Sequence, residues 1–366
     1  ISGGIANLAQ ANVKTLDFTA FNNAEAVYIA AGIRKTWAAG TLSQDLEPEY
    51  ITVHSSSAKA WVTLQENNAI GEIDLQSGTI IDIWPLGTKN FNLPGNGFDA
   101  SDNNNEILLA NWPVKAFYIP DAMATYNVGG VNYLVTANEG GEKEYDALEE
   151  RTTITNAAYI LDSARFPHAE MLKKNHNLGR MRITNLNGDI DNDGDFDEIY
   201  CVGTRSFSIW NADTKSLVYD SGDDFELYTS TAPSINPLFN SDHEDNSLKG
   251  RSRSKGPEPE GVTIAELSGN KYAFVSLERV GGVMVYDITN PATPAFMDYK
   301  NNRSVSAYTG DHGPDTLVFI PAVSKTDKNY LVVANEISGT LTVFEVVDNN
   351  PNGITGIGKK QVTFNI

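Results

Sequence analysis

The stretch KGPEPEGVTIAELSGNKYAFVSLERVGGVMVYD, residues 255–287, decides the fold of this chain. Within it, residues 261–266 alternate apolar with polar side chains, residues 271–277 are rich in β-branched and aromatic side chains, and residues 283–286 are again apolar. Turns rich in Gly and Asn separate the three runs, which is typical of short strands in a meander. The stretch therefore predicts an antiparallel meander of three strands.

Copies of this meander recur along the chain. The words KYAFVSLERVGGVMVYD align with KAWVTLQENNAIGEIDL from Lys59, NYLVTANEGGEKEY from Asn132 and NYLVVANEISGTLTVFEV from Asn329. A fifth, divergent copy spans residues 198–222. Strand motifs that repeat at roughly 40 to 60 residues are the sequence signature of a β-propeller. We therefore predict an all-β propeller with about five blades in this chain; the main alternative, a two-sheet sandwich, does not usually repeat one strand motif so often.

A lead-in segment precedes four of the copies, at residues 47–51, 112–116, 258–262 and 313–317. In a propeller the innermost strand of each blade lines the central channel. Glu49, Glu260 and Asp315 occupy equivalent places in three of these lead-ins. We therefore expect their carboxylates to meet at one mouth of the channel.

A second set of acids follows the second strand of three copies, at Glu139, Glu278 and Glu336. Carboxylates that converge either bind a cation or form ion pairs with basic residues such as Arg279. Two interpretations stay open, a structural pairing between blades and a functional channel site. The channel site would comprise Glu49, Glu260, Glu278, Arg279 and Asp315.

The densest cluster of acids is GDIDNDGDFDE, residues 188–198. Aspartates at alternate positions place carboxylates around one point, Gly194 allows a sharp turn, and the carbonyl oxygen of Asp195 can add a ligand. Ca²⁺ takes about six to eight such hard oxygen ligands, and acids this close repel one another unless a cation lies among them. The sequence therefore predicts a calcium site formed by Asp189, Asp191, Asp193, Asp195, Asp197 and Glu198. The alternative is an acidic turn that is exposed to water.

Composition disfavours several kinds of partner. Of 366 residues 41% are hydrophobic, and 47 acidic against 27 basic side chains give a net charge of −20. So acidic a chain disfavours nucleic acids and anionic membrane surfaces. No apolar run approaches the roughly 18 residues of a transmembrane helix. The single cysteine, Cys201, lies in an apolar strand pattern, and we expect it in the core.

Two segments are predicted to be helical insertions. The apolar spacing from Asn23 through Trp37 is that of a helix, which Gly40 would end. Residues 146–174 also carry apolar side chains at helical spacing, with Pro167 as a breaker.

Many longer words of the chain match one known family in order. Among them are DLEPEYITV, LPGNGFDASD, YLVTANEGG, KGPEPEGV, AFVSLERVGGVMVYDIT and GDHGPDTLVFIPA. Over nearly its whole length the chain resembles the choice-of-anchor I domain family. Members are secreted or surface-attached bacterial propellers related to the echinoderm mesenchyme-specific cell-surface glycoproteins. The resemblance implies a seven-bladed propeller, export across the cell membrane, and a C-terminal anchor or sorting module.

The resemblance also implies how this chain fits the family pattern. The family's first blades lie before the point at which this chain opens, so residues 1–347 are expected to form a partial propeller. Residues 348–366 are expected to be a linker or closing strand toward a missing C-terminal anchor or sorting module. Additional N-terminal blades or another polypeptide would close the ring, because an open sheet edge is prone to aggregation.

Three functions are compatible with these features. The leading hypothesis is a secreted or cell-surface calcium-binding propeller that acts as a binding or display module. The first alternative is a metal-dependent phosphoesterase, because family members are often described as alkaline-phosphatase-like or phytase-like; it would use Ca²⁺ in the channel and Arg251, Arg253 or Arg279 for phosphate. The second alternative is a structural surface protein. No residue is assigned a catalytic role, and the expected partners are a surface anchor or secretion machinery.

Overall fold

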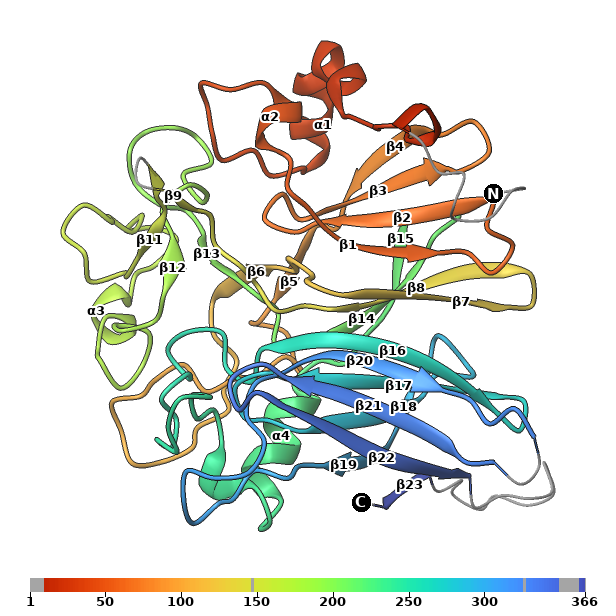
Figure 1. Ribbon diagram of the computed structural model, residues 1–366. Coiled ribbons are helices and arrows are strands. Elements are labelled where there is room, and N and C mark those ends of the chain that lie inside the picture. Colours follow the sequence, from red (N-terminus) through yellow and green to blue (C-terminus); the bar gives the residue numbers. More distant parts are fainter. Residues whose placement is uncertain (1–9, 146–147, 325–326, 349–361, 366) are drawn as a thin grey trace.

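The computed structural model describes residues 10–145, 148–324, 327–348 and 362–365. The chain is predominantly β, as predicted, and its main body contains four antiparallel sheets of four strands each (Figure 1). Short helices lie in the connections. None of the helices in these described residues is long and apolar enough to cross a membrane.

Three of the four sheets are simple meanders in chain order. The first contains β1 (Pro48–Val53), β2 (Lys59–Leu64), β3 (Ala69–Asp74) and β4 (Thr79–Pro85). The third contains β16 (Pro259–Leu267), β17 (Asn270–Leu277), β18 (Val283–Asp287) and β19 (Ala295–Lys300). The fourth contains β20 (Pro314–Ile320), β21 (Asn329–Asn335), β22 (Thr340–Asp348) and β23 (Val362–Asn365). The stretch 255–287 thus forms three consecutive strands, as its alternation predicts.

The second sheet corrects the predicted blade count. Its strands are β7 (Met123–Val128), β8 (Val131–Ala137), β14 (Phe207–Asn211) and β15 (Ser216–Asp220), in the spatial order β15-β14-β8-β7. Strand β8 pairs directly with β14, so the segments predicted as two blades form one sheet, and the described residues contain four four-stranded sheets, not five. The physical reason is burial: residues 142–145, Glu-Lys-Glu-Tyr, are too polar to lie between sheets, whereas β14 is apolar and buried.

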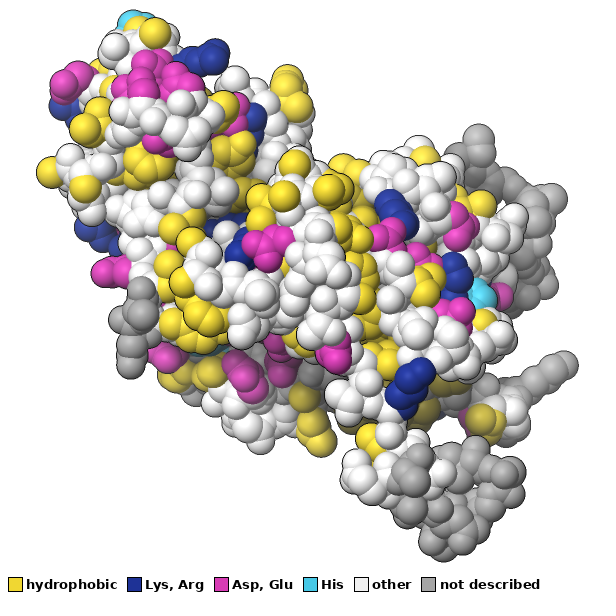
Figure 2. Space-filling view, turned by 90° about the horizontal axis from the view of Figure 1, so that it is seen from above, with side chains coloured by type: hydrophobic (Ala, Val, Ile, Leu, Met, Phe, Trp, Pro, Cys, Tyr) yellow, Lys and Arg dark blue, Asp and Glu magenta, His cyan; other side chains and the backbone are white. Residues whose placement is uncertain are grey.

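A side lobe accounts for the interruption between β8 and β14. It contains a three-stranded sheet of β5 (Thr88–Asn90), β6 (Val114–Phe117) and β13 (Ile199–Val202), in which β6 and β13 are parallel. Two strand pairs complete it, β9 (Glu144–Tyr145) with β10 (Leu148–Glu149) and β11 (Arg151–Thr152) with β12 (Ile183–Thr184). The strand pairs of the lobe lie at the left of Figure 1, whereas β5 and β6 lie nearer the centre; acidic side chains gather at the upper left of Figure 2.

The predicted helical insertion at residues 146–174 is wrong for most of its length. Within its described part, only α3 (Ala169–Leu172) is helical, and residues 146 and 147 lie outside the described residues. The apolar side chains of the segment instead pack between turns into the core of the lobe, together with Cys201, which is buried as predicted. They are Ile154, Tyr159, Leu161 and Phe166.

The N-terminal helix is shorter than predicted. It comprises the 3₁₀ turn η3 (Thr19–Ala24) and α1 (Glu25–Ala31), after a 3₁₀ turn η2 (Gln10–Asn12). Gly32, in the left-handed conformation with φ 113°, ends it, because glycine adopts this conformation without strain. Beyond Gly32 the chain turns inward, buries Ile33 and later forms α2 (Leu42–Asp45), so Gly40 is not the terminator.

The four sheets pack face to face in chain order. Trp61 of the first sheet meets Leu134 and Trp210 of the second in one buried cluster. A second buried cluster lies between the second and third sheets. It also includes Phe225 of α4 (Asp224–Thr231) and Leu238 of the 3₁₀ turn η4 (Asn236–Leu238). The third and fourth sheets share a further buried cluster. Apolar burial of about 25 cal/mol per Å² makes these interfaces the main source of stability.

Trp210 tests the composite second sheet. Its ring is buried beside Trp84 and Tyr118, and Nε1 donates a hydrogen bond to Thr136 Oγ1 on β8 (3.0 Å). We expect Trp210→Ala to lower the free energy of unfolding by about 3 to 5 kcal/mol, measured by urea denaturation. Leu227→Ala, at an exposed position of α4, is the control and should change it little. An equal effect of both substitutions would contradict the burial of β14 between two sheets.

Candidate functional site

The first strands of the four sheets bring acids to one cavity. A cavity of about 340 Å³ lies where β1, β7, β16 and β20 begin. The acids that line it are Glu49, Asp121, Glu260, Asp315 and Glu336. The structure thus brings together Glu49, Glu260 and Asp315, as their equivalent places in the lead-ins predict. We call these five acids and the space between them the acidic pocket.

Asp121 is the pocket acid that the sequence analysis missed. The second sheet starts after Pro120-Asp121, not after Trp112-Pro113, because the lead-in predicted at residues 112–116 belongs to β6 in the lobe. A Pro-acid dipeptide precedes or opens the first strand of every four-stranded sheet: Pro48-Glu49, Pro120-Asp121, Pro259-Glu260 and Pro314-Asp315. This dipeptide was the available signal for Asp121.

Irregular backbone aims these acids into the pocket. The pairing register shifts between Pro48 and Ile51 in β1, between Pro259 and Val262 in β16, and at the same place in β20. A β-bulge bends its strand and redirects the side chain at the bulge. In each of the three strands the acid is the residue immediately after the proline, within the bulge.

In the first and third sheets, a hydroxyl group in the second strand ties the bulge to the next sheet. Thr63 Oγ1 accepts a hydrogen bond from the Tyr50 amide (2.9 Å) and donates one to the Asp121 carbonyl oxygen (3.1 Å). Ser276 Oγ repeats the arrangement in the third sheet, between the Gly261 amide (2.8 Å) and the Asp315 carbonyl oxygen (3.1 Å). The position of one acid is therefore fixed by the sheet before it.

The residue before the proline is strained in the second and third sheets. Ile119 has a φ of 47° and Glu258 a φ of 51°, both in the left-handed region. A β-branched residue such as Ile119 rarely adopts this conformation. Backbone strain of this kind persists where the surrounding structure holds it, and it clusters at functional sites.

The pocket acids lack cationic partners. Among the residues that the structure describes, none of the five forms an ion pair with Lys, Arg or His. Burial, followed by the nearby carboxylates of Glu139 and Glu49, raises the pKa of Asp121 to about 8. Burial, followed by Glu139 and Glu278, raises the pKa of Glu260 well above its usual value.

A second group of acids beside the pocket, Glu139, Glu258 and Glu278, is by contrast neutralised by bases, and we call this group the wall. Glu258 is fully buried between Arg251 (2.5 Å), Lys255 (3.0 Å) and Arg279 (3.1 Å). Lys255 also pairs with Glu139. These cations hold the pKa of Glu258 below its usual range despite its burial. Pairing between acids and bases, one of the two interpretations of the repeated acids, thus describes the wall, whereas the pocket acids are unpaired.

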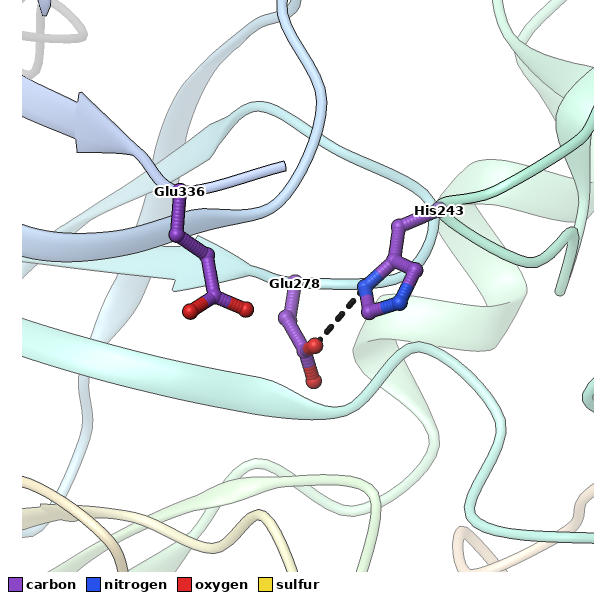
Figure 3. Close-up of side chains that lie close together, drawn as sticks. All are labelled: His243, Glu278 and Glu336. Atoms are coloured by element: carbon purple, nitrogen blue, oxygen red, sulfur yellow. Dashed lines mark ion pairs between the residues drawn. The ribbon is translucent and has the colours of Figure 1, made fainter. Parts of the chain in front are cut away.

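His243, Glu278 and Glu336 form a further cluster beside this wall (Figure 3). His243 Nδ1 lies 2.8 Å from Glu278 Oε1, and one atom of each residue falls within 4.8 Å of the others. Arg279 Nη1 lies 2.9 Å from His243 Nδ1 and its Nε lies 3.2 Å from Glu278 Oε2. Because the guanidinium group already occupies the space against His243, His243 and Glu278 belong to an ion-pair network with Arg279, and Glu336 lies beside it without an ion pair among the described residues.

The predicted calcium loop connects β12 to β13 in the side lobe, away from the pocket. Carboxylate oxygens of Asp189, Asp191 and Asp197 lie within 4.8 Å of one another. The loop is shaped by its own amides: Gly194 donates to Asp189 Oδ2 (3.1 Å) and Ile190 to Asp197 Oδ2 (2.9 Å). The other oxygen of Asp189, Oδ1, is buried and has no hydrogen-bond partner among the described groups.

Three of the six predicted ligands of the loop lie outside the group of three carboxylates. Both carboxylate oxygens of Glu198 are engaged outside the loop, one with Lys115 Nζ (2.6 Å) and one with the Tyr200 hydroxyl (2.5 Å). Glu198 is therefore removed from the predicted ligand set. Asp193 Oδ1 accepts the Asp195 amide (3.1 Å), and the side chains of Asp193 and Asp195 lie outside the group of three.

The chain belongs to the choice-of-anchor I domain family, whose profile matches residues 2–291. It is 27% identical over 350 residues to the mesenchyme-specific cell surface glycoprotein of Strongylocentrotus purpuratus, covering 84% of this chain and 41% of that protein. It is 30% identical over 190 residues to Gigasin-3a of Magallana gigas, covering 46% of this chain and 64% of that protein. The chain thus spans less than two thirds of either relative's length.

Solved structures resemble the fold only loosely. A periplasmic gluconolactonase of Pseudomonas aeruginosa is similar with a TM-score of 0.34 and 10% identity, over 87% of this chain and 56% of that one. An endo-arabinase of Bacteroides thetaiotaomicron is similar with a TM-score of 0.30 and 10% identity, over 87% and 79% of the two chains.

Asp121→Asn tests the electrostatics of the pocket. Because the pKa of Asp121 rises from 3.8 to about 8 on folding, the folded state binds more protons between these values. The free energy of unfolding should therefore fall as pH rises from about 4 to about 8. The substitution should flatten this fall, so that the variant matches the native chain near pH 4 and is more stable at pH 8, in urea titrations with chelator present.

The exposed Asp213→Asn variant serves as the control for that titration and should keep the native pH profile. Parallel profiles for Asp121→Asn and the native chain would show that the pocket acids are solvated as freely as a surface carboxylate.

Proposed function

We propose that this chain is a calcium-binding β-propeller module of a secreted or cell-surface protein. The observation that carries the proposal is the loop between β12 and β13, where Asp189, Asp191 and Asp197 each direct a carboxylate oxygen to one point. Three carboxylates this close repel one another strongly unless a cation or full solvation separates them. The buried, unpartnered Oδ1 of Asp189 is not solvated.

The loop supplies the kind of ligand that Ca²⁺ takes. Ca²⁺ binds six to eight oxygens at about 2.3 to 2.6 Å in flexible geometries. Asp189, Asp191 and Asp197 provide carboxylates, Asp193 lies at the next alternate position, and the carbonyl oxygen of Asp195 follows Gly194. Gly194 has a φ of 100°, which permits the sharp turn around the ion. Water would complete the shell.

The propeller arrangement is supported by the way in which the sheets repeat. Four sheets of four strands pack face to face in chain order, and their first strands meet at one cavity. Inner strands that surround a common axis are typical of a β-propeller. The prediction that further blades or another chain complete the ring stays a prediction.

The location is inferred from family and relatives. The chain belongs to a family named for its anchor, and one relative is described as a cell surface glycoprotein. A net charge of −20 suits a calcium-rich extracellular setting, because acidic side chains are the ligands that such ions use. A surface anchor or the secretion machinery remains the expected partner.

Chelation tests the calcium site. Binding to the folded loop alone stabilises the chain by about 2.7 kcal/mol when free Ca²⁺ is about 100 times Kd. We therefore expect EGTA to lower the melting temperature of the native chain and Ca²⁺ to restore it. Asp191→Ala should remove this response, since Asp191 is exposed and its loss should leave the apo fold intact.

Asp213→Ala, another exposed aspartate outside the loop, is the matched control and should keep the response to Ca²⁺. If the native chain melts at the same temperature with Ca²⁺ and with EGTA, the loop is a solvated turn. The alternative function, a structural surface protein, is then preferred.

For the phosphoesterase alternative, the acids that would bind the metal are together in the pocket, but the three arginines that would bind phosphate are all held in ion pairs. Arg251 pairs with Glu258 (2.5 Å), Arg253 with Asp102 (2.9 Å), and Arg279 with Glu258 (3.1 Å) and Glu278 (3.2 Å). Guanidinium groups held in this way are poorly placed to receive a phosphate, and the acidic pocket would repel it. The calcium-binding module is therefore preferred.

A phosphatase assay separates the two functions. We expect no hydrolysis of p-nitrophenyl phosphate above background with Ca²⁺, Mg²⁺ or Mn²⁺ present. Hydrolysis that requires Ca²⁺ and disappears in Glu260→Gln, but persists in the exposed Glu266→Gln, would establish the phosphoesterase instead.

A further inference from the structure

We infer that the acidic pocket binds a divalent, oxygen-preferring cation through Asp121 and Glu260, with Glu139 beside them. Ligand atoms of these three residues lie within 4.8 Å of one another, a spacing that a single ion can bridge. The site is separate from the calcium loop, which lies in the side lobe, and it does not rest on the proposed calcium function.

The first argument is a buried oxygen without a partner. Glu260 Oε2 has no solvent contact and accepts no hydrogen bond from any group that the structure describes. A buried carboxylate oxygen without a donor is costly, because it loses its water and gains nothing in exchange. A carboxylate oxygen of Glu260 lies within 4.8 Å of carboxylate oxygens of Asp121 and Glu139, which are acceptors too when ionised, so these neighbours can satisfy Glu260 only through a shared proton or a cation.

The second argument is the charge that surrounds the cavity. The five pocket acids line a space of about 340 Å³, and none of them has an ion-pair partner among the described residues. The nearby bases already form ion pairs with the acids of the wall. Lys255 pairs with Glu139 and Glu258. Arg279 pairs with Glu258 and Glu278. The protein has neutralised the wall and left the cavity negative.

The third argument is that the backbone is built to hold these acids together. Pro-acid dipeptides, bulges and the hydroxyl ties from Thr63 and Ser276 all fix the inner ends of the strands. Ile119 and Glu258, the residues before two of the prolines, accept strained φ values of 47° and 51° to do so. An arrangement that served only packing would not need acids at all four places.

The ligand class follows from the donor atoms. Asp121 and Glu260 offer only carboxylate oxygens, which suit Ca²⁺, Mg²⁺ and Mn²⁺ and select against zinc sites rich in nitrogen or sulfur. The two oxygens of Glu139 accept hydrogen bonds from Lys255 and Gln65, so Glu139 adds charge beside the ion. The cavity is open enough to keep water on the ion. Glu49, Asp315 and Glu336 then supply a negative surround that attracts the cation and orders its water.

Calorimetric titration of the full chain with CaCl₂, MgCl₂ and MnCl₂ tests this inference. The native chain should show a binding event that persists in the loop variant Asp189→Asn/Asp191→Asn. In the pocket variant Asp121→Asn/Glu260→Gln that event should weaken at least tenfold, whereas binding at the loop is kept. Glu266→Gln, an exposed glutamate on the same strand as Glu260, is the matched control and should bind like the native chain.

Proton release gives an independent readout. Because burial and the nearby carboxylates raise the pKa of Asp121 to about 8, cation binding should expel its proton, and titrations at pH 7 in buffers of different ionisation enthalpy should reveal this release. The single variants Asp121→Asn and Glu260→Gln remove repulsion and should fold; each should reduce the release. The loop variant should leave it unchanged.

The outcomes are distinguishable from those of the calcium loop. If the loop variant alone changes binding, and the pocket variant matches the native chain in affinity and in proton release, the inference is wrong and the pocket acids only share protons. If the pocket variant alone changes binding, the inference holds and the proposed calcium loop fails.

Discussion

Mutual repulsion of carboxylates at the inner ends of the strands is the constraint on which the rest of this structure depends. Each four-stranded sheet begins with a proline and an acid, and the acids meet at one cavity. Unit charges about 4 Å apart interact by several kcal/mol in a partly buried setting. The apolar interfaces between successive sheets, in which Trp61, Trp210, Phe207 and Phe274 are fully or almost fully buried, offset that cost.

The protein divides its acids into two electrically different groups. Glu258, Glu278 and Glu139 are matched by bases, chiefly Lys255 and Arg279, and form a rigid wall. The pocket acids lie in front of that wall without partners among the described residues. The nearby bases pair with the acids of the wall, so the cavity itself stays negative. A negative cavity attracts cations and repels phosphate. The side lobe repeats the theme with a local loop of aspartates.

The repeat of the strand motif was sufficient to single out the meanders and four of the five pocket acids, because both depend on local pattern. The composite second sheet could not be predicted in this way. Strand β8 and its partner β14 are separated in sequence by residues 138–206, and no periodicity encodes the return of the chain across that separation. The same error hid Asp121, because Trp112-Pro113 resembles a lead-in although it enters the lobe. For Glu198, sequence spacing could not show that Lys115 and Tyr200 would take both carboxylate oxygens.

The predicted helical insertion at residues 146–174 was wrong for a related reason. Apolar residues at positions 154–166 have helical spacing, yet their side chains pack into the core of the lobe from turns. Tertiary packing outweighed a propensity that is worth less than about 1 kcal/mol per residue.

The most direct test of the account is where cations lie in the folded protein. Crystals grown with Mn²⁺, a carboxylate-seeking ion with a usable anomalous signal, should show an anomalous peak between Asp121 and Glu260 and a second peak among Asp189, Asp191 and Asp197. An anomalous map with no peak in the acidic pocket, at Mn²⁺ concentrations that fill the loop, would contradict the claim that repulsion among the pocket acids is resolved by a bound cation.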